Sequence, residues 1–220
     1  MHIYEGILSC SAHGQELLAA GALAAAVGTA VGLRRLGPER VPQAGLLSAV
    51  FFVASLVQVP VGPSSVHLVL TGLLGLVLGW AAFPALLVAL ILQAAFFSIG
   101  GFTTLGLNTV IMALPAVICY YLFRRAAAAD SEWLVLCAGF AAGATAVLLG
   151  ASITTGVLIL AGKEFSALAP LILAVHLPSA AVEGLVTGSI VVFIRKVRPE
   201  LLDAPRLVPE FECEMQNVER

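Results

Sequence analysis

The chain has 220 residues, of which 60% are hydrophobic and 11% are charged, and its formal net charge is -2. This charged fraction is less than half of the ~25% found in an average soluble domain, which excludes an ordinary soluble globule. Eleven basic against 13 acidic residues exclude the basic surface of a nucleic-acid-binding protein. The composition therefore indicates an integral membrane protein.

A run without Asp, Glu, Lys or Arg extends over 83 residues, from position 41 to position 123. At about 20 residues per membrane-spanning helix, it has room for three or four spans. Turn signals divide it at Pro60–Ser65, near Phe83–Pro84 and at Gly100–Asn108. With the apolar stretches on either side, we expect an all-α integral membrane protein of about seven transmembrane helices. The expected spans are 16–33, 45–60, 66–82, 84–100, 108–123, 133–162 and 167–194.

Basic residues collect after the first, fifth and seventh expected spans. They are Arg34, Arg35, Arg40, Arg124, Arg125, Arg195, Lys196 and Arg198. Because cytoplasmic loops carry the excess of Lys and Arg, we expect the N-terminus outside and the C-terminus in the cytoplasm. The chain then divides into a polytopic membrane domain, 1–198, with an N-terminal segment, 1–15, at its external face, and a cytoplasmic tail, 199–220.

The external side is expected to bring three segments within reach of one another: the N-terminus, the break at 60–65 and the turn at 100–107. Residues 1–15 lack the basic region, apolar region and cleavage site of a secretory signal, so Met1 is expected to be the mature terminus. Within the spans, glycines at helical spacing predict close helix packing. They are Gly72, Gly75 and Gly79 in the third span, and Gly139 and Gly143 in the sixth.

His2 directly follows the initiator methionine. The amine of Met1, the backbone nitrogen of His2 and a ring nitrogen of His2 can hold one metal ion in two fused chelate rings. A fourth nitrogen would complete a square, and His67, on the same expected side, is the natural donor. Four nitrogens in a tetragonal arrangement suit nickel(II) or copper(II). The alternative is that both histidines are ordinary hydrogen-bonding groups; His13 is expected to be solvated.

His176 and Glu183 lie inside the seventh expected span. Ionisable groups in a membrane are functional candidates, and a seven-residue offset places these two on one helix face. They could relay protons or ions in a gradient-driven secondary transporter, or they could hydrogen-bond to other helices near Pro178. A membrane enzyme with a catalytic metal would need a nearby base, for which Glu5 is the one close candidate.

The opening Met1-His2-Ile3-Tyr4-Glu5-Gly6-Ile7-Leu8 resembles the start of the substrate-capture subunits of energy-coupling-factor transporters for cobalt and nickel, the CbiM/NikM family. The resemblance continues in Gly62–Leu68, in the stretch Gly72–Trp80 and in Gly100–Asn108, and covers nearly the whole chain. The segment before His67 reads S-S-V-H-L here, against an S-C-S-H-P pattern associated with cobalt-type members. The choice between nickel and cobalt therefore stays open.

The resemblance implies the substrate-binding membrane subunit of an ABC-type importer in the cytoplasmic (inner) membrane of a prokaryote. It implies that Met1, His2 and His67 bind the divalent ion, which is cargo rather than cofactor. The implied partners are a transmembrane coupling subunit, cytoplasmic ATPase subunits and a small auxiliary membrane subunit. The chain itself has no Walker-type phosphate-binding motif, in agreement with a transporter subunit that is not an enzyme.

Overall fold

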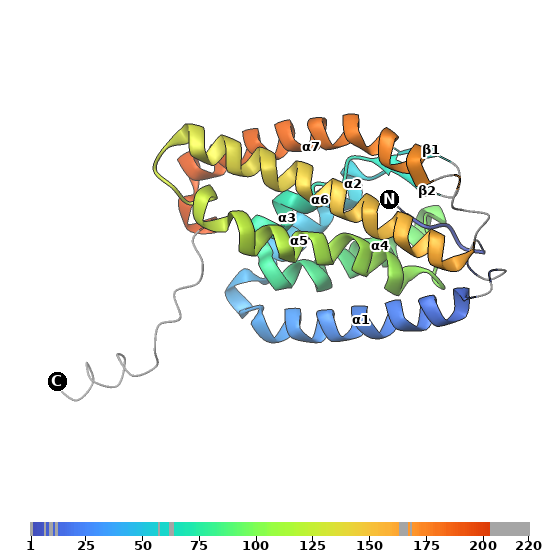
Figure 1. Ribbon diagram of the computed structural model, residues 1–220. Helices are drawn as coiled ribbons and strands as arrows, with labels where there is room; N and C mark the ends of the chain where they lie inside the picture. The colour runs from blue at the N-terminus through green and yellow to red at the C-terminus, as the bar shows by residue number, and fades with distance from the viewer. Residues whose placement is uncertain are drawn as a thin grey trace, which may run out of the picture.

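The computed structural model describes residues 2–6, 8, 11, 13–56, 58–61, 64–162, 167 and 169–202, with the backbone alone for 58–61, 64–67 and 169. Met1 and most of the expected tail, 199–220, lie outside the described residues. The helices run along one long axis, with the first described residues toward one end and the end of α7 at the other (Figure 1).

Each expected span overlaps mainly with one α-helix of the structure. The helices are α1 (Gly14–Arg35), α2 (Val41–Ala54), α3 (Thr71–Leu78), α4 (Ala82–Phe97), α5 (Leu105–Ala127), α6 (Glu132–Ala161) and α7 (Ala169–Val197). A 3₁₀ turn at Pro38–Arg40 leads into α2, whose Pro42 lies in the first turn, where a missing N–H costs nothing. Helices α1, α5 and α7 end in basic residues, which favour helix C-termini.

Among the residues that the structure describes, five helical segments are long and apolar enough to cross a membrane, by length and composition. They are Gly14–Arg35, Thr71–Phe97, Leu105–Ala127, Glu132–Ala161 and Pro170–Val197. Helix α2, with 14 residues, and α3, with 8, fall short of the ~20 residues that one crossing needs. The all-helical membrane architecture is thus confirmed in outline, and the seven crossings stay a prediction.

A short hairpin replaces helix where two spans, 45–60 and 66–82, were expected. Strand β1 (Gln58–Val61) pairs antiparallel with β2 (Ser64–His67), with Gln58 opposite His67. Prolines and β-branched residues explain this, because Val-Pro-Val and Pro-Ser-Ser-Val disfavour helix and the valines favour strand. Helix α3 begins only at Thr71, so the span boundaries predicted on both sides of the break were wrong.

The chain reverses direction between α3 and α4, at Gly79. This glycine has a φ of +56°, which L-residues rarely adopt. Helix α3 leads toward the end of the bundle where Arg35 ends α1, and its Val77 accepts a hydrogen bond from the Arg40 side chain. Helix α4 leads away from that end, toward the N-terminal segment, as the hydrogen bond between Gln93 of α4 and His2 shows. The apolar segment 71–97 is therefore two helices joined by a turn.

Four of the five glycines predicted to allow close packing do so, and the fifth, Gly79, lies in the turn instead. A Cβ on Gly72 would lie 2.6 Å from Gly143 Cα, and a Cβ on Gly75 would lie 2.2 Å from the carbonyl oxygen of Ala116. A Cβ on Gly139 would lie 2.7 Å from Gly188 Cα. Because backbones that approach this closely leave no room for a side chain, these glycines fix α3 against α5 and α6, and α6 against α7.

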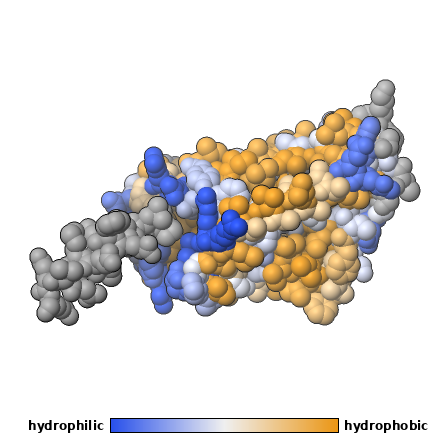
Figure 2. All heavy atoms as spheres, turned by 90° about the horizontal axis from the view of Figure 1, so that it is seen from below, coloured by the Kyte–Doolittle hydropathy of each residue, from blue (hydrophilic) through white to orange (hydrophobic). Residues whose placement is uncertain are grey.

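The basic residues that follow the odd-numbered spans gather at one end of the bundle. Arg35 of α1 donates to Tyr121 of α5 at 3.1 Å, and Arg195 of α7 lies 3.3 Å from Asp130 in the turn between α5 and α6. Lys196 pairs with Glu132 at 3.0 Å. Figure 2 shows an apolar belt along the middle of one face, with hydrophilic residues toward its ends. This distribution is that of a protein surrounded by hydrocarbon at its middle.

Replacing Gly75 by Ala should destabilise the bundle, because the added methyl group meets the main chain of α5 rather than a flexible side chain. We expect a loss of about 1–3 kcal/mol, seen as a lower thermal unfolding temperature in detergent. Gly156→Ala is the matched control, since a Cβ at this helical position meets nothing within 4 Å. Equal unfolding temperatures for the two variants would contradict the packing described here.

Candidate metal-binding site

The N-terminal segment is held inside the bundle by Asn108, at the start of α5. The amide oxygen of Asn108 accepts a hydrogen bond from the backbone N–H of Ile3 at 2.9 Å, and its nitrogen donates to the carbonyl of Ile3 at 3.1 Å. The same nitrogen lies 3.2 Å from the Thr104 hydroxyl. A side chain that meets both main-chain groups of one residue fixes its position and direction, and both Ile3 and Asn108 are buried.

Glu5 fastens the same segment to the turn before α5. Its backbone N–H donates to the carbonyl of Gly100 at 2.6 Å, and its carboxylate accepts from the backbone N–H of Thr103 at 3.2 Å. Gly101 has a φ of +123°, and a Cβ there would lie 2.5 Å from Cβ of Glu5. The structure thus confirms that the N-terminus and the 100–107 turn meet.

The imidazole of His2 is fully buried, and a chain of hydrogen bonds determines its protonation. The Ser55 hydroxyl donates to the carbonyl of Phe51 at 2.7 Å, so its oxygen accepts from the amide nitrogen of Gln93. The amide oxygen of Gln93 therefore faces Nε2 of His2, at 3.1 Å. Because that oxygen can only accept, Nε2 carries the proton, and the lone pair of the neutral ring is on Nδ1.

Burial also keeps this ring neutral. Desolvation, opposed in part by the hydrogen bond to Gln93, lowers the pKa of His2 to about 3. The neutral imidazole is the form that binds metal ions. His2 is thus a neutral imidazole with its proton on Nε2 and its lone pair on Nδ1.

The other two predicted donors are placed less fully. Met1 lies outside the described residues. His67 is the last residue of β2, and the structure describes its backbone alone. Among the residues that are described, no three His, Cys, Asp or Glu side chains lie together as a metal cluster. A donor set that uses main-chain nitrogens needs no such cluster, and the three-residue set stays a prediction.

Glu183 connects α7 to the segment that follows His67. Its carboxylate is buried and accepts hydrogen bonds from the backbone N–H groups of Val69 and Leu70; those from Leu70 measure 3.1 Å to Oε1 and 2.9 Å to Oε2. These groups lie at the N-terminal end of α3, where the helix dipole favours a negative charge. Both carboxylate oxygens are occupied by main-chain donors, as expected of an interhelical anchor.

His176 is bound to its own helix. Its Nδ1 donates to the carbonyl of Ile172 at 2.7 Å, one turn earlier in α7. Within the described part of the chain, no hydrogen bond joins it to Glu183. His13 is exposed beside Glu16, at 3.4 Å, as expected for a solvated residue.

Sequence reasoning missed the residues that orient His2. Neither Gln93 nor Ser55 was singled out for this role. The available signal was the rarity of amide side chains in apolar spans, but nothing in one sequence pairs Gln93 with a residue 91 positions away.

Comparison with known proteins shows which family and which structures this chain is similar to. Residues 2–201 match the family described as the cobalt uptake substrate-specific transmembrane region. A protein of Haemophilus influenzae named for metal transport is 43% identical, over 92% of this chain and 97% of its own. The cobalt transport protein CbiM of Sorangium cellulosum is 32% identical, over 76% and 78%. A crystal structure of a transition metal transporter, 25% identical, superposes with a TM-score of 0.73 over 98% of this chain and 99% of its own.

Removing the Asn108 side chain should release the N-terminal segment. Asn108→Ala deletes two hydrogen bonds to Ile3, worth about 2 kcal/mol together. We expect the amide of Ile3 to exchange with deuterium about 30-fold faster. Thr109→Ala is the control, because its hydroxyl bonds only within α5. Unchanged exchange in the Asn108 variant would show that the segment is held by other contacts.

Replacing Glu183 should loosen the start of α3. Glu183→Ala leaves buried N–H groups without an acceptor, at about 1–3 kcal/mol each, whereas Glu183→Gln keeps one oxygen and should lose less. The order expected in thermal unfolding is wild type, Gln, then Ala. Ser189→Ala, an exposed change on the same helix, should unfold with the wild type. An alanine variant as stable as the wild type would refute the anchor.

Proposed function

We propose, for a chain that belongs to the cobalt uptake substrate-specific transmembrane family, a role as the subunit that captures nickel(II) or cobalt(II) outside the cell for import. Membership makes it a transmembrane component of cobalt and nickel uptake, a transporter rather than an enzyme. The observation that carries the finer proposal is the buried, neutral imidazole of His2, held in one orientation beside the chain terminus.

The proposed site holds the ion with nitrogens alone. The amine of Met1, the backbone nitrogen of His2 and Nδ1 of His2 form the two fused rings, and His67 supplies the fourth nitrogen. The hydrogen-bond chain through Gln93 supports this set, because protonation at Nε2 leaves on Nδ1 the lone pair that the second ring needs. A histidine that binds a metal ion is usually oriented by a hydrogen bond from its other ring nitrogen. Four nitrogens in a plane suit nickel(II).

The proposed topology has seven crossings, with the N-terminus outside. The third crossing would consist of β2 and the short helix α3 together, since irregular backbone at membrane depth is tolerated where protein buries it. Two features support this: the basic residues share one end of the bundle, and the N-terminal segment docks at the other. The membrane would be the cytoplasmic membrane of a prokaryote.

Energy for import would come from partners. We infer a transmembrane coupling subunit, cytoplasmic ATPase subunits and a small auxiliary membrane subunit. The fused nickel transport protein NikMN of Rhodobacter capsulatus supports a further membrane component, because this chain, 38% identical over 80% of its length, spans 56% of that protein. The absence of a Walker-type motif from this sequence agrees with ATP hydrolysis elsewhere.

A nickel(II) and cobalt(II) titration of the purified chain, followed by absorption, tests the site. The chain is compared with one that carries several residues ahead of Met1, and with His67→Ala. We expect the native chain to give the band of planar nickel, and both altered chains to lose or shift it. His13→Ala, an exposed histidine close in sequence, should bind like the native chain.

The outcomes separate the donors. An unchanged band in the extended chain would remove the Met1 amine from the site, and an unchanged band in His67→Ala would remove that side chain. Loss of the band in His13→Ala would show that the exposed histidine, rather than the buried set, binds the ion.

A further inference from the structure

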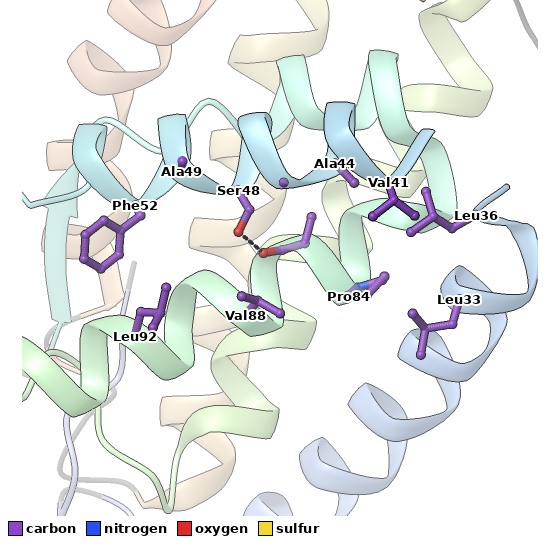
Figure 3. A pocket seen from close by; sticks show the side chains of 12 residues that line it. Leu33, Leu36, Val41, Ala44, Ser48, Ala49, Phe52, Pro84, Val88 and Leu92 are labelled. Atoms are coloured by element: carbon purple, nitrogen blue, oxygen red, sulfur yellow. Dashed lines mark hydrogen bonds between the residues drawn. The ribbon is translucent and has the colours of Figure 1, made fainter. Parts of the chain in front are cut away.

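An apolar groove opens on the surface between α2, α4 and the end of α1 (Figure 3). Its volume is about 360 Å³. Residues that line it include Leu33, Val41, Gly45, Phe52, Val88 and Leu92. Leu33, Val41, Val88 and Leu92 are exposed in the isolated chain, so the groove faces the surrounding hydrocarbon rather than the interior.

The groove offers no polar group to a ligand. The single hydroxyl in its lining belongs to Ser48, which donates to the carbonyl of Ala85 at 2.8 Å (Figure 3). Gly45 also lines the groove, and an added Cβ there would meet nothing within 4 Å. A molecule bound in the groove would therefore be held by apolar contacts alone.

The dimensions decide between a helix and a single hydrocarbon chain. From Val41 to Phe52 the groove follows α2 for about 16 Å, at 1.5 Å per residue. A volume of 360 Å³ over that length gives a cross-section of about 20 Å². A helix about 10 Å wide would need several times more, whereas an extended chain in contact with its neighbours at about 4–4.5 Å fits.

Basic residues neighbour in sequence the two lining residues, Leu33 and Val41, at one end of the groove. Arg34, Arg35 and Arg40 flank these two residues, against one acid, Glu39. Arg35 lies over the ring of Trp80, and Arg40 donates to the carbonyl of Val77. Arg34 is exposed and makes no hydrogen bond or ion pair within the described part of the chain. A basic group at this depth attracts an anionic headgroup.

We propose that the groove binds one acyl chain of an anionic phospholipid, with the headgroup at Arg34. The headgroup would lie at the end of the bundle away from the proposed metal site. The lipid would fill the seam between α2 and α4, the pair of helices that carries Ser55 and Gln93.

The test uses the full chain reconstituted in vesicles with equal amounts of phosphatidylglycerol and phosphatidylcholine of the same acyl chains. Native mass spectrometry after gentle extraction counts the retained lipids. Gly45→Leu places a side chain in the groove, and Gly156→Leu is the matched control, because it is also a helical glycine with nothing within 4 Å of an added Cβ. We expect Gly45→Leu to retain at least fivefold less phosphatidylglycerol than Gly156→Leu or the wild type.

Arg34→Gln tests the headgroup. It should reduce the preference for phosphatidylglycerol over phosphatidylcholine about fivefold while the groove stays open. Equal lipid retention by the two leucine variants, or none by the wild type, would overturn the proposal. So would a Gly45→Leu chain that keeps its lipid but no longer assembles with co-expressed partner subunits, which would assign the groove to a partner helix.

Discussion

One chain of hydrogen bonds determines what the N-terminus of this protein can do. It begins at a main-chain carbonyl of α2, passes through Ser55 and Gln93, and ends at Nε2 of His2. The Ser55 hydroxyl donates to that carbonyl and accepts from the amide nitrogen of Gln93. The amide oxygen of Gln93 therefore faces His2, and the imidazole proton lies on Nε2. Because the ring is buried, no water competes for these bonds. Helices α2 and α4 thereby control the chemistry of a residue near the chain terminus.

A second constraint operates in the middle of the bundle, where Glu183 is buried among apolar helices. A carboxylate there is costly unless strong donors meet it. Its partners are main-chain groups, Val69 and Leu70, in the connection between β2 and α3. The anchor allows a short helix to begin inside the bundle, and it ties α7 to the segment that follows His67. In the seam between α2 and α4, the Ser48 hydroxyl donates to the carbonyl of Ala85, and Gln93 donates to Ser55 at the end of α2.

Much of this fold follows from the sequence because hydrocarbon cannot hydrogen-bond to the backbone, so segments that cross a membrane are apolar helices. Runs of apolar residues located the α-helices of the described residues, although the number of membrane crossings stays a prediction, and basic residues predicted which helix ends would lie at one end of the bundle. The hairpin was missed because an apolar run does not distinguish a strand buried in protein from a helix. The reversal between the third and fourth helices was predicted near Phe83–Pro84 but lies at Gly79, because this glycine fits both a close-packed helix and a turn with positive φ, and only the surrounding contacts decide.

The site was predictable in part. The position of His2 next to the terminal amine suggested a chelate, since the spacing alone makes the two rings. The orientation of the ring was not predictable, because it depends on Ser55 and Gln93, which the fold brings together across 38 residues. Likewise, Glu183 suggested a relay as much as an anchor until its main-chain partners were known.

Nickel X-ray absorption on the metal-loaded, full-length chain with a free N-terminus tests the central claim most directly. The account predicts the edge feature of square-planar nickel and a first shell of four nitrogens, both lost in His2→Ala. A six-coordinate, oxygen-rich shell that is the same in the native chain and in His2→Ala would contradict it.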